Sequence, residues 1–169
     1  MKVIGKCLVA GLCATAALAT GSARGQEATF TVKVMTPEAA LKAAQAALKK
    51  CRDDGYQVSV AVVDRSGVTQ VVLRDRFAGP HTVDMAVDKA WTAVTFRTPT
   101  GEIAKATAPG TAQSGIHNRP RVAAVAGGLL IEAGGALVGG IGVSGAPRGD
   151  IDDVCATAGI DAVRDSLEF

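Results

Sequence analysis

The chain has 169 residues, of which 48% are hydrophobic but only 4% aromatic, and its formal net charge is +2. This length fits one domain, and the shortage of aromatic residues predicts a core of Ala, Val, Leu and Ile. Lys and Arg form no cluster interleaved with aromatic residues. The composition therefore gives no electrostatic support for nucleic-acid binding.

Residues 1–25 have the composition of a secretory signal. Lys2 and Lys6 precede an apolar run over residues 7–19, and small residues follow that run. The run is shorter than the roughly 20 residues that a membrane-spanning helix needs, so we expect no membrane span. Three basic residues and no acidic ones lie in this segment, so its removal changes the net charge from +2 to −1. We expect a signal peptide over 1–25, a single domain over 26–169, and a periplasmic or secreted location.

A short lead-in precedes the first predicted helix. Alternating apolar residues over 30–34 favour a small edge strand. Residues 36–54 are predicted to form a helix, because Thr36 is a good N-cap residue and Pro37 suits the first turn. The apolar positions of this helix recur every three or four residues and would share one face: Leu41, Ala44, Leu48 and Cys51.

The next segment combines a hairpin with a second helix. Residues 57–64 and 68–75 are rich in Val and are joined by a turn that contains Gly67, which predicts an antiparallel pair. A helix follows over 81–96, with Lys89 on its solvated side beside Asp84 and Asp88. Its expected apolar stripe consists of Val83, Ala86, Val87, Ala90 and Val94. A weak helical segment at 102–106 and a loop at 107–121 complete this part of the chain.

Residues 122–145 are predicted to form three short strands. The turns between them would lie at Gly127-Gly128 and Gly134-Gly135, because glycine adopts positive φ at little cost. The same segment contains G-x-G-x-x-G at 140–145, but Pro147 follows and too little chain remains for a second β-α-β half. We interpret these glycines as positions where a helix packs tightly on a strand.

A last helix is predicted from Asp150. Its expected apolar face consists of Ile151, Val154, Cys155 and Ala158. The order of elements is helix, two strands, helices, three strands and helix. Antiparallel hairpins flanked by helices predict an α+β fold, with helices on both faces of the sheet.

Three sequence features together resemble the GlcG/HbpS family. They are the hairpin VAVVD-x-x-G, the P-H-T start of the second helix and the strand end IGVSG, and they occur in the family's order over residues 36–163. The resemblance implies a profilin-like fold with a five-stranded antiparallel sheet. It also implies that haem or a related tetrapyrrole is bound by some members, and that the protein forms a symmetric homo-oligomer, often an octamer.

The resemblance makes His81 a candidate ligand of haem iron. It stands at a helix start, where the neutral, ligating form of imidazole is favoured. The alternative is a solvent-facing or capping histidine. Met85, one turn later, is a candidate to line the same pocket or is a core or interface residue.

Three further residues are weaker candidates for ligand binding. His117 lies in the long loop and is either a surface histidine or part of a site. Arg97 and Arg119 are candidates to bind haem propionates or the carboxylate of a small acid, and otherwise are solvated charges. No G-x-S-x-G, H-E-x-x-H, C-x-x-C or Walker sequence is present, so no catalytic set is predicted.

Cys51 and Cys155 are the cysteines that remain outside residues 1–25. Each lies on the apolar face of its predicted helix, and the implied fold packs the first and last helices on the same side of the sheet. We therefore predict a disulfide between them, which an oxidising compartment permits. The alternative is a pair of buried free thiols.

The sequence therefore supports three hypotheses. The preferred one is an exported haem- or small-ligand-binding protein that forms a homo-oligomer. The second is an enzyme or accessory subunit acting on a small organic acid or a tetrapyrrole, for example in haem degradation. The third is a sensor-partner module without a ligand.

Overall fold

The computed structural model describes residues 28–167, so the predicted signal peptide lies outside the described residues. Residues 1–31 and 32–169 form two separate units, and every helix and strand of the described part belongs to the second. Within the described residues, no helix has both the length and the apolar character needed to cross a membrane.

The second unit is built on one antiparallel sheet, which confirms the α+β class. Its strands lie in the spatial order β2-β1-β4-β3, and every neighbouring pair is antiparallel. Their bounds are β1 Ser59–Asp64, β2 Thr69–Arg74, β3 Gly128–Ala133 and β4 Ala136–Ser144.

The described residues contain four strands, so the expectation of five is wrong. Residues 30–34 are not in a strand, and neither are residues 122–127. The hairpin at Gly134-Gly135 is confirmed, with positive φ at both positions. Gly127 is not a hairpin turn: its carbonyl accepts a hydrogen bond from the Val143 amide, and the chain runs straight on into β3. The preceding segment is held by a helix instead, since the Ala123 amide donates to the hydroxyl of Thr92.

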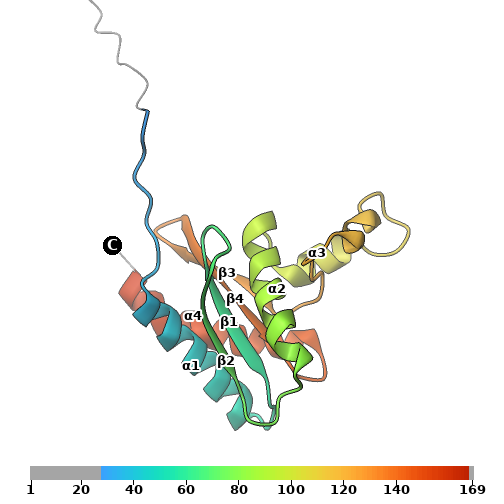
Figure 1. Cartoon of the computed structure of the whole chain (residues 1–169), viewed down its shortest axis with the longest axis horizontal. Helices are drawn as coiled ribbons and strands as arrows, with labels where there is room; N and C mark the ends of the chain where they lie inside the picture. The colour runs from blue at the N-terminus through green and yellow to red at the C-terminus, as the bar shows by residue number, and fades with distance from the viewer. Residues whose placement is uncertain (1–27, 168–169) are drawn as a thin grey trace, which may run out of the picture. The chain divides into compact units, whose positions relative to one another are not determined.

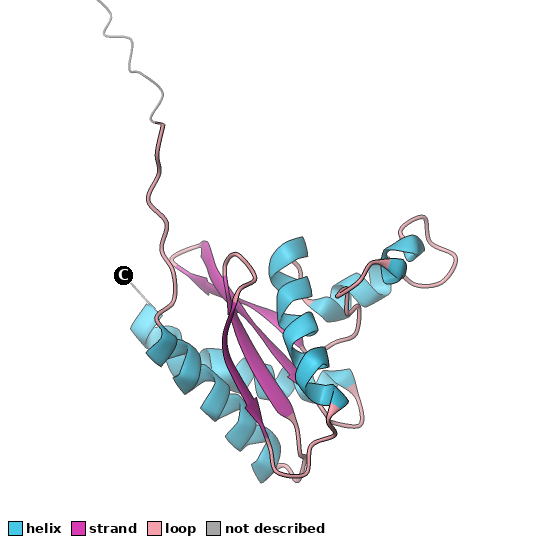
Figure 2. Cartoon of the chain, viewed as in Figure 1, coloured by secondary structure: helices cyan, strands magenta, loops and turns pink. Residues whose placement is uncertain are grey.

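Helices cover both faces of the sheet (Figures 1 and 2). Helix α1 (Pro37–Asp53) and helix α4 (Gly149–Leu167) lie on one face, and α2 (His81–Phe96) lies on the other. Helix α3 (Thr100–Ala106) and the 3-10 helix η1 (Ser114–Asn118) lie in the connection from α2 to β3. The predicted range of α2 is confirmed, whereas the predicted loop at 107–121 contains η1.

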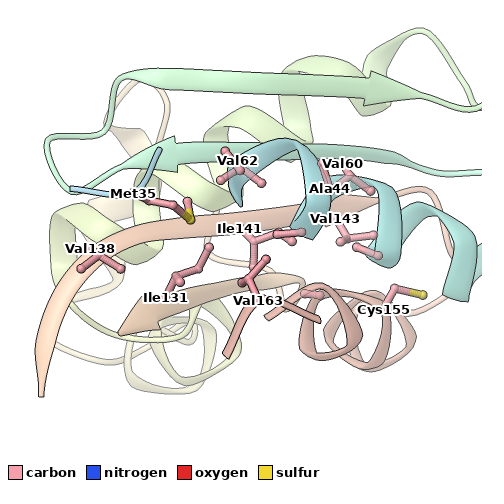
Figure 3. Packing of buried hydrophobic residues seen from close by; sticks show 14 of the residues in the cluster. Met35, Ala44, Val60, Val62, Ile131, Val138, Ile141, Val143, Cys155 and Val163 are labelled. Carbon is pink, nitrogen blue, oxygen red and sulfur yellow. The ribbon is translucent and has the colours of Figure 1, made fainter. Parts of the chain in front are cut away.

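The main core lies between the sheet and the pair α1 and α4 (Figure 3). Cys51 and Cys155 are fully buried there and form the predicted disulfide, with 5.4 Å between their Cα atoms. Helix α1 presents its alanines to this core, while Leu41 is 39% exposed, which corrects the predicted face. Close helix packing explains the difference: a Cβ on Gly159 of α4 would lie only 2.7 Å from the carbonyl oxygen of Ala43.

The opposite face has little room for side chains, because α2 lies directly on β4. A Cβ on Gly140 would lie 2.5 Å from Val94 and 3.0 Å from the carbonyl oxygen of Ala90. A Cβ on Gly142 would collide with the carbonyl group of Ala86. The interpretation as helix-packing positions is confirmed for Gly140 and Gly142, whereas it is wrong for Gly145, where a Cβ would meet Gln57 and Val58 before β1.

Candidate functional site

A hollow of about 340 Å³ opens where the start of α2, the end of β4 and the start of α4 meet. His81 is the first residue of α2, and its exposed imidazole lies against Gly79, where a Cβ would come within 2.7 Å of the ring. Met85, one turn later, is 38% exposed and lines the same hollow. The structure thus brings these two predicted site residues together.

A buried ion pair lies one further turn along α2. The Lys89 ammonium donates to Oδ2 of Asp152 at 2.8 Å and to the carbonyl oxygen of Val143 at 2.9 Å. The two side chains are 3% and 4% exposed. Oδ1 of Asp152 accepts a hydrogen bond from the Ala146 amide at 3.1 Å. The pair therefore ties α2 to the end of β4 and to the loop that closes the hollow.

Two carboxyl groups at the start of α4 are affected by this burial. Burial raises the pKa of Asp152, and Lys89 and the Ala146 amide offset part of that increase. Burial also raises the pKa of Asp153, whose Oδ1 accepts from the Gly127 amide at 2.7 Å. Each carboxyl thus holds one loop in place through a backbone N–H group.

Residue 127 must be a glycine because the chain passes directly against the ion pair of Lys89 and Asp152. Its φ of +120° suits glycine, and a Cβ there would lie 2.6 Å from the Lys89 ammonium and 2.9 Å from Cβ of Asp152. Any larger residue at this position would displace the ion pair or the loop.

The other three predicted site residues lie elsewhere. Arg97 caps the opposite end of α2, about 24 Å from His81 at the helical rise of 1.5 Å per residue. His117 lies on η1, where Nε2 is 2.9 Å from both the hydroxyl and the carbonyl oxygen of Thr107. Arg119 follows η1 directly and is exposed. Within one chain, these residues lie in a different region from the hollow beside His81.

The model of one protein family, described as haem degrading protein HbpS-like, matches residues 35–161. The chain belongs to this family. It is 46% identical to HbpS from Streptomyces reticuli, whose double-mutant crystal structure superposes with a TM-score of 0.75 over 87% of this chain and 98% of that one. The ORFY protein of Klebsiella pneumoniae is 29% identical, with a TM-score of 0.78 over 81% of this chain and 95% of that one.

Two further comparisons involve PduO proteins. PduOC, in the crystal structure of its complex with haem, is 29% identical to this HbpS-like chain. The TM-score is 0.71 over 77% of this chain and 95% of that one. The corrinoid adenosyltransferase PduO of Citrobacter freundii is 33% identical over 116 residues, which are 68% of this chain and 35% of that protein. The HbpS-like chain therefore spans about a third of the length of this adenosyltransferase.

The residues around the hollow of the HbpS-like chain fit a haem group held at the surface. Of the described residues that line the hollow, His81 alone carries an imidazole. Met85 and the half-exposed Val125 offer apolar contact, and Arg148, which is also paired with Asp150, offers a cation at the edge. A volume of about 340 Å³ is near the lower end for small-molecule sites. One chain would therefore enclose only part of the macrocycle.

Sequence reasoning missed the ion pair of the HbpS-like chain. Lys89 was expected on the solvated side of α2, and this prediction is wrong because Lys89 faces the hollow. A signal was present, since His81, Met85 and Lys89 are spaced by four residues and so share one helix face. The buried position of Asp152 had no such signal, because the apolar residues of α4 predicted a different face. That predicted face included Val154, which is 50% exposed, while Asp152 is buried.

Proposed function

We propose that this protein binds haem or a related tetrapyrrole through His81, at the hollow between the starts of α2 and α4. One observation carries the proposal: an exposed imidazole stands at the first turn of α2, beside an open hollow with Met85 and Val125 on its walls. The membership of the HbpS-like family and the haem complex of PduOC support this choice of ligand.

The proposal gives each residue of the hollow a role. A bound haem would supply an iron that accepts a nitrogen ligand, and the His81 imidazole would be the residue that holds it. Met85 and Val125 contact the apolar ring, and Arg148 pairs with a carboxylate of the ligand. The buried pair of Lys89 and Asp152 keeps the start of α2 and the loop at Ala146 in register on either side of the ligand.

We further propose that the protein is exported and forms a homo-oligomer, of which the octamer is the form that the resemblance implies. The composition of residues 1–25 and the buried disulfide support export, because disulfides persist in oxidising compartments. The open hollow supports assembly, since a second copy would cover the ligand surface that one chain leaves exposed. Cell fractionation tests the location, and light scattering on the eluting peak of a sizing column tests the assembly.

Titration of the purified protein with hemin tests the haem site. A Soret band with a shifted maximum is expected for the wild type, and His81→Ala is expected to weaken binding at least tenfold. His117→Ala is the matched control, because it removes the other histidine from a distant region and should leave the titration unchanged. An unchanged Soret band and affinity in His81→Ala would overturn the proposal.

A second candidate function is haem degradation, which the description of the family model favours. Bound hemin incubated with a reductant and dioxygen distinguishes the two functions. A carrier returns the pigment intact, whereas a degrading enzyme bleaches the Soret band through repeated turnovers. Parallel titration with cobalamin tests whether a corrinoid is the preferred tetrapyrrole, as the PduO relatives suggest.

A further inference from the structure

Residues 97–121, the first part of the connection between α2 and β3, form an arm that extends away from the sheet (Figure 1). A second hollow, of about 630 Å³, lies on this arm. We call it the arm hollow. It is larger than the hollow beside His81 and is bounded by the end of α2, by α3 and by η1. Since α2 is 16 residues long, its two ends lie about 22 Å apart, and the two hollows are separate.

Hydrogen bonds hold the walls of the arm hollow together. The Thr107 hydroxyl donates to the carbonyl oxygen of Ile103 at 2.7 Å, so it has no hydrogen left for His117. Nε2 of His117 lies 2.9 Å from the hydroxyl and the carbonyl oxygen of Thr107, and it must therefore be the donor to both. The hydrogen on Nε2 therefore attaches η1 to the end of α3.

The root of the arm is also held in place. Arg121 adopts a positive φ of 70°, which is unusual for a residue other than glycine. Its guanidinium lies 4.6 Å from the centroid of the Trp91 ring and 3.3 Å from the carboxylate of Asp88, and its carbonyl oxygen accepts from the Thr92 hydroxyl. These contacts fix the point where the arm returns to the domain.

The chemistry of the lining selects the kind of ligand. Phe96, Ile103, Ala106 and Ile116 supply apolar surface from three elements. Glu102 is the charged residue of the lining, and none of the described residues that line the hollow is a Lys or an Arg. A ligand with carboxylates, such as haem, would therefore meet a like charge and no cation here.

We propose that the arm hollow binds an apolar small molecule that carries a hydrogen-bond donor, in the class of aromatic amines, with Glu102 accepting that donor. The volume lies within the range of about 300–1,000 Å³ typical of small-molecule sites, and an apolar lining with few polar groups is typical of such sites as well. This site is independent of His81 and of the proposed haem binding.

Two fluorescent probes with the same ring system test the proposal on the full chain. N-phenyl-1-naphthylamine is neutral and has one N–H donor, and 8-anilino-1-naphthalenesulfonate adds a negative charge to it. We expect the neutral probe to bind at least tenfold more tightly than the sulfonate. Glu102→Gln should reduce this preference, because it removes the like charge that the sulfonate meets.

Ala106→Phe fills the hollow from an exposed position on α3, so it should lower the affinity for the neutral probe at least tenfold without loss of fold. His81→Ala is the matched control and should leave probe binding unchanged, so a failed haem site would not affect this result. Equal binding of the probe to Ala106→Phe and to the wild type would overturn the proposal. A second result would also overturn it: the wild type binds no probe, and Ala106→Phe dissociates an oligomer that the wild type forms. That result would assign the hollow to contact with a second copy of the chain.

Discussion

The two faces of the sheet are stabilised in different ways. The face under α1 and α4 carries the large apolar core and the disulfide between Cys51 and Cys155. The face under α2 is lined by glycines where the helix lies against the backbone, and its edge carries the buried pair of Lys89 and Asp152. The difference teaches that the large apolar side chains and the covalent cross-link are concentrated on one face, whereas the polar groups that shape the hollow beside His81 are concentrated on the other.

Each face also has an ion pair with a buried carboxyl group, and the pKa values of the two carboxyls are shifted in opposite directions. At the end of α1, Arg52 donates two hydrogen bonds of 2.9 Å to Asp75, which lowers the pKa of that carboxyl. At the middle of α2, burial outweighs the effect of Lys89 and raises the pKa of Asp152. Asp75 is itself buried, with its side chain 2% exposed, but its hydrogen bonds from the half-exposed Arg52 outweigh that burial. In the pair of Lys89 and Asp152 both side chains are enclosed, and burial has the larger effect.

The largest effect is expected on the disulfide face. Removal of the disulfide by Cys51→Ala with Cys155→Ala should lower the free energy of unfolding by about 4–5 kcal/mol, because the bond closes a loop with a sequence separation of 104. Urea unfolding of the double variant beside the oxidised wild type measures this. Hemin affinity of the folded variant should stay unchanged, since the bond is on the other face. Two reactive thiols in the unfolded, unreduced wild type would contradict the disulfide itself.

The next effect is expected at the buried pair. Lys89→Met leaves Asp152 without a partner and should cost about 3–5 kcal/mol at pH 8. The double variant Lys89→Met with Asp152→Leu is the matched control and should recover most of this loss, because no uncompensated charge remains. Unfolding in urea measures both. Equal losses in the single and double variants would show that packing, rather than charge, explains the effect.

The smallest effect is a difference in pH dependence between the two acids. Asp75 has a lowered pKa in the folded state, so its contribution to stability is present above the unfolded value of about 3.9 and is lost as the pH falls through the folded value. Asp152 has a raised pKa, so its contribution is present below about pH 3.9 and is lost as the pH rises through the folded value.

Urea unfolding between pH 3 and pH 7 measures this difference. Asp75→Asn should flatten the loss of stability at the acid end, and Asp152→Asn should change the slope above about pH 4. The same change of slope in both variants would contradict the comparison.

The helix starts and the turn at Gly134-Gly135 could be predicted because their signals are local, whereas the turn expected at Gly127-Gly128 was wrong. Thr36 caps α1 by accepting from the Ala39 amide, and Gly134-Gly135 turn the hairpin as expected. Helix faces were predicted less well, because apolar periodicity favours large side chains. Helix α1 buries Ala43 and Ala47 and leaves Leu41 partly exposed, since the close approach of α4 at Gly159 leaves room only for small residues.

The sequence by itself determined the order of the main helices and of the two hairpins, the start of α2 at His81 and, through the resemblance, the cysteine pair. Only the tertiary structure decided that Lys89 meets Asp152, 63 residues later, and that residues 97–121 leave the domain as an arm with its own hollow. The reason is physical: caps, turns and periodicity depend on neighbours a few residues away. A buried ion pair or a hollow depends instead on how distant helices and strands pack against one another.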